Sequence, residues 1–394
     1  MIKPFKSFSP KPEYVKQIAA LPYDVVSTDE ARLEIENNKI TFLTVDKPEA
    51  TLEKDIDQYS EKVYKKGVEN FDLLNKYFEY LTDEPSFYIY ELSFMGNTQT
   101  GIAALVSTED YNTNKIKKHE LTRPPKEEDR INHMLSLKAH TGPIFMTYKG
   151  NEKVTELLKN YKEQNKPIYD FISKDVTHKV WIITDNNINK KISEYFEKID
   201  SLYIADGHHR AAAASKTHDR LNIPSTENFL AVIFPKDELK ILAYNRVIKG
   251  YLGFDIDNFI QNLQEKFYVE ESKEPVIPIV SDIFGIYISN KWYKISLKKK
   301  INDLPVKILT ENIIQPILKI EDQRTSDRID FVGGIESIKN IIELVDDKKW
   351  DIGITVCPTT MDQLIEISDQ NGLMPPKSTW FEPKLLSGIF INKF

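Results

Sequence analysis

One short segment constrains this chain more than any other. An apolar run, Leu202–Ala205, is followed by Asp206-Gly207-His208-His209-Arg210 and then by the alanines 211–214. The apolar run predicts a short buried strand, and alanine has the highest helix propensity of all residues. The polar residues therefore fall at a turn between a strand and a helix.

The start of the predicted helix favours a bound anion. The first backbone N–H groups of a helix have no partner within it, and the helix dipole is positive there. Arg210 and the two histidines add further donors, so phosphate is the best-fitting ligand. A purely structural role is the alternative, in which Asp206 caps the helix and Gly207 makes the turn. The residues alone leave both interpretations open.

Composition restricts the class of protein. A chain of 394 residues is long enough for two or three domains. The net charge of −7 argues against a protein whose main task is to grip a nucleic acid backbone. The single cysteine, Cys357, excludes a disulfide framework and a cysteine-based zinc site. The chain starts without a signal peptide and has no apolar run of about 20 residues, so we expect no membrane partner and a cytoplasmic protein.

Strand-like and helix-like segments alternate along the chain, which predicts a mixed α/β protein of the α+β class. We expect a first domain over residues 1–250 and a second over residues 251–394. Ser27-Thr28-Asp29-Glu30 has the form of a capping box. Further expected elements are a helix from about Leu52 to Tyr80 broken near Gly67, a strand over Lys240–Ile248, a hairpin over Gly285–Ile295 and a strand over Gly388–Ile391.

A second polar cluster runs from Lys117 to Arg130. Glu120 lies among basic residues, where a carboxylate stays ionised and can accept a proton from a hydroxyl group. Arg130 offers a planar donor fork that suits phosphate. The alternative is a solvated loop that leads into a helix.

A third cluster is Pro375-Pro376-Lys377-Ser378-Thr379. The prolines stiffen the backbone ahead of one ammonium and two hydroxyl groups, a row that suits a carboxylate or a phosphate. A rigid surface loop is the alternative. Pro22-Tyr23-Asp24-Val25 is interpreted as structural packing.

In this order the motifs resemble a widespread bacterial family of unknown function that is related to free serine kinases of the ParB/sulfiredoxin-like superfamily. The resemblance covers nearly the whole chain. It depends on Lys3–Lys6, Leu21–Val25, His119–Thr122, Glu128–Arg130, Ala139–Phe145, Asp206–Arg210 and Met374–Thr379. The chain departs from the family pattern at Leu21, Ala211 and Asn245.

The resemblance implies a ParB/sulfiredoxin-like core and a second α/β domain, with the active site in the cleft between them. It implies a kinase that converts free L-serine to O-phospho-L-serine with ATP or ADP and Mg²⁺. Glu120 would be the general base, and Asp206 would cap the turn rather than contact Mg²⁺ through water. The implied catalytic residues are Glu120, His209 and Arg210; those for nucleotide are Asp206, Gly207, His208, His209, Arg210 and Arg130; those for substrate are His119, Lys377, Ser378 and Thr379.

Other functions remain open at this stage. ParB relatives suggest a nucleic-acid-binding or nuclease protein, which the acidic composition disfavours. A sulfiredoxin-like reductase would need a reactive cysteine where this chain has His208, and Cys357 lies in an apolar strand where thiols are inert. A nucleotide-binding sensor without catalytic activity is the remaining alternative. The sequence does not predict the oligomeric state.

Overall fold

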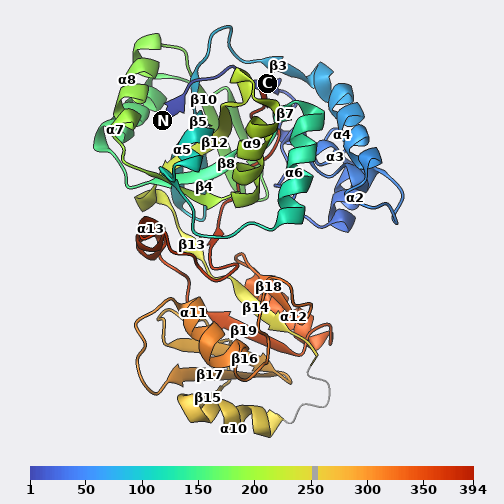
Figure 1. The fold of residues 1–394 in the computed structure, drawn as a ribbon, viewed down its shortest axis with the longest axis vertical. Helices are drawn as coiled ribbons and strands as arrows, with labels where there is room; N and C mark the ends of the chain where they lie inside the picture. The colour runs from blue at the N-terminus through green and yellow to red at the C-terminus, as the bar shows by residue number, and fades with distance from the viewer. Residues whose placement is uncertain (251–255) are drawn as a thin grey trace. The chain divides into compact units, whose positions relative to one another are not determined.

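A computed structural model describes residues 1–250 and 256–394 of the chain (Figure 1). The chain divides into two compact units, Met1–Leu239 with Pro383–Phe394, and Lys240–Glu382. The predicted boundary between residues 250 and 251 differs from this division, and the predicted start of the second domain lies outside the described residues. The C-terminal residues belong to the first unit because strand β21 (Asn392–Lys393) pairs with β7 (Ala139–His140).

A large mixed sheet forms the centre of the first unit. Its strands, in order, are β6 (Ile116–Lys117), β11 (Leu202–Asp206), β8 (Ile144–Tyr148), β12 (Asn228–Pro235), β5 (Asn97–Ser107), β4 (Phe87–Phe94), β10 (Val176–Ile183) and β9 (Tyr169–Ser173), and β1 (Ile2–Lys3) pairs with β5. Strands β12 and β8 are parallel, as are β11 and β6, whereas the other neighbours are antiparallel. The sheet confirms the predicted mixed α/β class.

Helices cover this sheet, and Figure 1 shows α6 and α9 side by side. The helices are α1 (Val15–Ile18), α2 (Thr28–Asn37), α3 (Leu43–Asp46), α4 (Glu61–Leu74), α5 (Thr108–Asn112), α6 (Pro124–Leu137), α7 (Glu152–Gln164), α8 (Asn186–Glu197) and α9 (His208–Leu221). Ala211, Ala213 and Ala214 of α9 lie in the same buried cluster as Ile144 and Met146 of β8. Small side chains let this helix approach the sheet closely, which holds its first turn against the strand ends.

The helix predicted over Leu52–Tyr80 is wrong at both ends. Helix α4 spans only Glu61–Leu74, and the last predicted residues form β3 (Phe78–Tyr80), which pairs with β2 (Phe8–Pro10). Packing overrides helix propensity here, since the Phe78 ring stacks on Phe8 at a centroid distance of 5.3 Å. Gly67 does not break the helix; a Cβ there would lie 3.1 Å from Cγ of Pro48, so glycine permits a close contact.

The second unit contains an antiparallel sheet. Its strands, in order, are β15 (Phe267–Ser272), β17 (Lys291–Leu297), β16 (Ile283–Ile288), β19 (Ile352–Val356), β14 (Asn245–Ile248) and β18 (Ile329–Val332). The other elements are α10 (Ile256–Lys266), α11 (Pro305–Leu309), a π-helix (Thr310–Ile314), α12 (Ser337–Asp346), α13 (Met361–Asp369), and a pair formed by β13 (Ile241–Leu242) and β20 (Trp380–Phe381). Strands β16 and β17 confirm the predicted hairpin over Gly285–Ile295.

Two predicted strands differ from the structure. The strand expected over Lys240–Ile248 is divided into β13 and β14, which pair in separate sheets. The segment Gly388–Ile391 forms only an isolated bridge between Ile391 and Phe8. In both cases the apolar pattern predicts that the segment is buried, but it does not predict which strand the segment pairs with.

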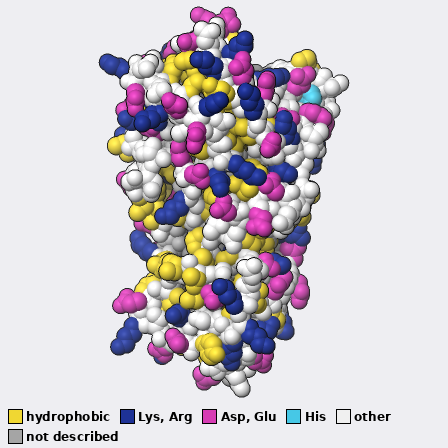
Figure 2. All heavy atoms as spheres, turned by 90° about the vertical axis from the view of Figure 1, so that its left-hand side faces the viewer, with side chains coloured by type: hydrophobic (Ala, Val, Ile, Leu, Met, Phe, Trp, Pro, Cys, Tyr) yellow, Lys and Arg dark blue, Asp and Glu magenta, His cyan; other side chains and the backbone are white. Residues whose placement is uncertain are grey.

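Among the described residues, no helix is long and apolar enough to cross a membrane. On the face shown in Figure 2, Lys and Arg side chains are interspersed with Asp and Glu. This face therefore does not present the continuous basic surface that a nucleic acid backbone requires.

Candidate functional site

The predicted strand-to-helix turn is present at the start of α9. Strand β11 ends at Asp206, and Gly207 occupies the N-cap position with φ of +96° and ψ of 30°. The alternative in which Asp206 caps the helix is wrong, because the N-cap residue is Gly207 and no side chain caps the helix. Instead, Asp206 accepts a hydrogen bond from N–H of Gly207 at 2.9 Å and from Nζ of Lys384 at 2.9 Å.

Arg210 folds back onto this turn. A Cβ at Gly207 would lie 3.1 to 3.2 Å from the guanidinium of Arg210. Nη1 of Arg210 donates to the carbonyl of Pro143 at 2.6 Å, whereas its buried Nε has no hydrogen-bond partner among the described residues. The side chain also has no ion-pair partner among those residues, although Arg210 is only 7% exposed. A buried charge without a counter-ion is costly, so this guanidinium suits an anionic ligand.

The structure brings the loop that carries Glu120 to the start of α9. Three side chains meet there: His119, Glu120 and His208. Each offers one atom that could bind a metal, and these three atoms lie within 4.8 Å of one another. The rings of His119 and His208 meet edge to face, with centroids 4.4 Å apart. His119 and His208 are buried and Glu120 is half-buried, so a carboxylate lies at the edge of the predicted phosphate site.

His209 also contacts the loop that carries Glu120. Its Nε2 accepts a hydrogen bond from the backbone N–H of Arg123 at 3.1 Å. Close by, the carboxylate of Glu127 accepts hydrogen bonds from Thr122 and Lys216. Burial raises the pKa of Glu127, but Lys216 and Thr122 outweigh it and hold the pKa below its usual range. These contacts join the Glu120 loop to α6 and α9.

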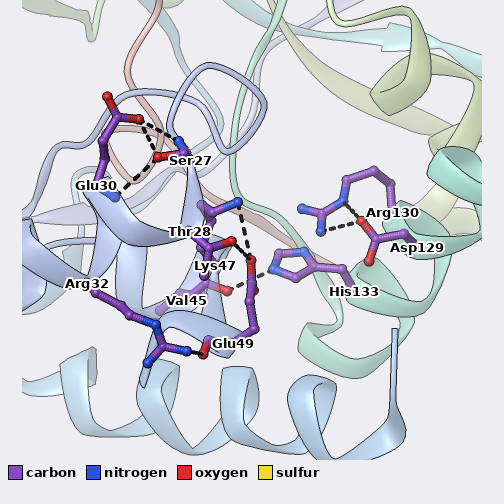
Figure 3. A network of polar contacts seen from close by, with 10 residues as sticks. All are labelled: Ser27, Thr28, Glu30, Arg32, Val45, Lys47, Glu49, Asp129, Arg130 and His133. Atoms are coloured by element: carbon purple, nitrogen blue, oxygen red, sulfur yellow. Dashed lines mark hydrogen bonds and ion pairs between the residues drawn. The ribbon is translucent and has the colours of Figure 1, made fainter. Parts of the chain in front are cut away.

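Arg130 lies in a neighbouring polar network (Figure 3). Its Nε and Nη2 donate to Oδ2 of Asp129 at 2.9 and 2.7 Å, and its guanidinium lies 3.9 Å from the ring centroid of Tyr23. Burial lowers the pKa of Arg130, but Asp129 outweighs this effect and the pKa is raised. Because Asp129 balances its charge, Arg130 is less suited to phosphate than Arg210. Tyr23, interpreted from sequence as packing, supports this guanidinium.

Lys377, Ser378 and Thr379 belong to the second unit. Oγ of Ser378 donates to the carbonyl of Pro375 at 2.6 Å, which stiffens the turn. The buried Arg246 donates to the carbonyls of Pro376 and Lys377 at 3.4 and 3.3 Å, and burial lowers its pKa to about 10. The predicted substrate contacts of this segment stay a prediction.

Sequence reasoning missed two contributors to the site. Lys384 pairs with Asp206, and no local pattern marks a lysine that lies 178 residues away. Gly142 allows Arg210 to reach Pro143, since a Cβ at Gly142 would lie 3.3 Å from Nη1 of Arg210. The segment Ala139–Phe145 carried part of the family resemblance, so that motif was the available signal.

Buried histidines make the first unit sensitive to acid. Burial lowers the pKa of His119, His140 and His178 to about 4 each. Histidine in the unfolded chain binds a proton near pH 6.5. Between pH 6.5 and 4 the unfolded chain therefore binds more protons than the folded chain, and the free energy of unfolding decreases as the pH is lowered.

We expect each histidine to reduce the free energy of unfolding by about 3 kcal/mol over that interval. Urea unfolding between pH 7.5 and 5 measures how steeply the free energy of unfolding changes with pH, in a range where most carboxylates do not yet titrate. His140→Phe should reduce the slope by up to about 1.4 kcal/mol per pH unit. An unchanged slope in that variant would contradict the assignment.

The donor set at the site does not fit Mg²⁺ as a resident ion. Mg²⁺ prefers oxygen ligands, whereas the cluster offers two imidazoles and one carboxylate. The carboxylate of Asp206 is already paired with Lys384. We therefore assign no step to an Mg²⁺ ion held by these residues.

The fold defines a mixed α/β protein, in which the loop that carries Glu120 lies at the start of α9. Residues 2–323 match the family described as protein of unknown function (DUF1015), and the chain belongs to this family. No curated protein matches the chain.

Solved structures show distant likenesses. A free serine kinase mutant in complex with AMP is 14% identical, with a TM-score of 0.38 and coverage of 71% of this chain and 87% of that chain. A conserved hypothetical protein from Pyrococcus furiosus is 16% identical, with a TM-score of 0.37 and coverage of 73% and 94%. SbnI with a C-terminal truncation, from Staphylococcus aureus, is 13% identical, with a TM-score of 0.38 and coverage of 72% and 85%.

Proposed function

We propose that this protein phosphorylates the hydroxyl of free L-serine, with ATP or ADP as phosphoryl donor. One observation carries the proposal. The carboxylate of Glu120 lies beside His208 at the start of α9, and the same turn holds the buried guanidinium of Arg210 without an ion-pair partner among the described residues. A proton acceptor next to an anion site is the arrangement that phosphoryl transfer to a hydroxyl requires.

The helix start would hold the phosphates of the nucleotide. Its first N–H groups have no side-chain cap, and Nε of Arg210 has no hydrogen-bond partner in the described part of the chain. A phosphate oxygen supplies an acceptor for such donors and balances the buried charge. Lys384 neutralises Asp206, which reduces the repulsion between that carboxylate and the nucleotide. Arg130 is a weaker candidate because Asp129 already balances it.

Glu120 would orient the serine hydroxyl and accept its proton. Such general-base assistance contributes about 10²–10⁴-fold to a reaction rate. His119 is 1% exposed, which favours a role in positioning Glu120 over the predicted direct contact with serine. His209 would position the loop through its hydrogen bond with Arg123. We further propose, from the sequence resemblance, that Lys377, Ser378 and Thr379 bind the carboxylate of the amino acid and that the core is ParB/sulfiredoxin-like.

The direct test is a product assay. Purified protein is incubated with L-serine, MgCl₂ and either ATP or ADP, and O-phosphoserine is measured by mass spectrometry. We expect product that depends on both serine and nucleotide. L-threonine, L-homoserine and glycerol in place of serine define the acceptor.

Two other outcomes would contradict the proposal. Nucleotide binding by calorimetry without product from any of these acceptors would favour a sensor. Salt-dependent DNA binding at physiological ionic strength, with no product, would favour a nucleic-acid-binding protein.

A further inference from the structure

We propose that His119, Glu120 and His208 form a binding site for a transition metal ion, with Zn²⁺ as the ion that fits best. The site is distinct in chemistry from the Mg²⁺ that accompanies a nucleotide. Its existence does not depend on the proposed kinase activity, although it shares Glu120 with it.

The donor types favour zinc over magnesium. Two imidazole nitrogens with one carboxylate oxygen form a recurrent protein ligand set for Zn²⁺, in which the fourth position holds water or substrate. Imidazole is a preferred ligand of zinc and other late transition metals, whereas Mg²⁺ takes oxygen ligands.

The geometry also fits a single ion. In a tetrahedral zinc site, ligand atoms lie about 3.4 Å apart, since each is about 2.1 Å from the metal. The three ligand atoms here lie within 4.8 Å of one another. The shift needed to close around an ion is therefore at most about 1.4 Å. Glu120 lies in a loop and is half-buried, so its side chain can make most of that movement.

The surroundings of His119 resemble those of a metal ligand. Its ring is hydrogen-bonded to the backbone of Ile204 in β11, and the carboxylate of Asp206 lies close enough to act on its charge. Histidines that bind metals donate their other ring N–H to a carbonyl or carboxylate, which sets the tautomer and the ring orientation. The edge-to-face contact with His208 holds both rings in place.

A bound ion would have a consequence for the proposed kinase. Coordination occupies a lone pair of the Glu120 carboxylate, which is the group proposed to accept the serine proton. We therefore expect zinc to inhibit phosphorylation. This consequence depends on the proposed function, whereas the binding measurement below does not.

The test is calorimetric titration of the full chain, prepared without a histidine tag and stripped with EDTA. We expect one Zn²⁺ per chain, bound at least about 1000-fold more tightly than Mg²⁺. Glu120→Gln and His208→Ala should each weaken Zn²⁺ binding at least about tenfold, as the loss of a group at a metal site does. His218→Ala is the matched control, because His218 lies on the same helix and its Nδ1 is hydrogen-bonded to Thr226 at 2.9 Å. The control should bind Zn²⁺ like the unchanged protein.

The proposal is overturned if Mg²⁺ binds as tightly as Zn²⁺, or if both site variants bind Zn²⁺ unchanged. Circular dichroism of each variant checks the fold. If His208→Ala unfolds, Glu120→Gln still tests the site, because Glu120 is only half-buried. Failure of zinc binding leaves the serine assay unaffected, and failure of the serine assay leaves zinc binding unaffected, so the two proposals are judged separately.

Discussion

Replacing Glu120 with glutamine is expected to lower the rate of serine phosphorylation at least about 100-fold. Glutamine keeps the length and shape of the side chain but cannot accept the proton of the attacking hydroxyl. Because Glu120 is half-buried in a loop, the amide should not disturb the core of the first unit. The effect should appear in kcat, since the proton is transferred only as the reaction proceeds.

Glu128→Gln provides a matched control for this change. Glu128 lies on α6, where its two oxygens accept hydrogen bonds from Arg220 at 3.0 and 2.7 Å, and both side chains are exposed. Exposed ion pairs contribute only about 0–1 kcal/mol, so this variant should fold and turn over normally. The two variants make the same chemical change, one at the site and one on the surface.

Steady-state kinetics give kcat for both variants, and melting curves show whether each variant is folded. A normal fold with a large loss of kcat in Glu120→Gln alone supports the role of proton acceptor. Turnover of Glu120→Gln within about threefold of the unchanged protein would exclude general-base catalysis by this residue, since such assistance contributes at least about 100-fold.

The sequence predicted those features that depend on local interactions. The turn from Asp206 to Arg210 follows from an apolar run, a glycine and an alanine run. The capping box is present, since Oγ of Ser27 accepts from N–H of Glu30 at 3.2 Å and Oε2 of Glu30 accepts from N–H of Ser27 at 2.8 Å. The Gly285–Ile295 hairpin joins neighbouring segments. In each case the partners lie within a few residues, so composition and spacing specify the geometry.

Features that depend on distant partners were not predictable. The return of Pro383–Phe394 to the first unit depends on pairing between β21 and β7, which are far apart along the chain. Sequence placed both Arg130 and Arg210 among the phosphate ligands, with Arg130 as the weaker candidate, but it gave no structural reason for the difference. Only the fold shows that Asp129 neutralises Arg130, whereas Arg210 is buried against Gly207 with no carboxylate partner among the described residues. Charge balance in a buried site is a tertiary property.

Replacing Gly207 with alanine is expected to weaken nucleotide binding at least about tenfold, because buried hydrogen bonds to charged groups contribute about 1.5–3 kcal/mol each. The new methyl group would lie 3.1 to 3.2 Å from Nη2, Cζ and Nε of Arg210, so the guanidinium must move. That movement displaces the donor proposed to hold the phosphates. The left-handed backbone adds a stability cost of about 1–2 kcal/mol for any residue with a Cβ.

Gly96→Ala separates these two effects. Gly96 has φ of +78°, in the turn between β4 and β5, and a Cβ there would meet nothing within 4 Å. This variant should therefore suffer the same kind of backbone strain, about 1–2 kcal/mol, without touching Arg210. Its affinity for AMP or ADP, measured by calorimetry, should stay close to that of the unchanged protein.

The comparison isolates the part that Arg210 plays. If Gly207→Ala and Gly96→Ala lose similar stability but only Gly207→Ala loses affinity, the loss is due to the displaced guanidinium and not to a weaker fold. Equal affinities in the two variants would mean that Arg210 does not contact the phosphates. The proposed nucleotide site would then lose its main support, which is the buried guanidinium of Arg210 whose Nε has no hydrogen-bond partner in the described part of the chain.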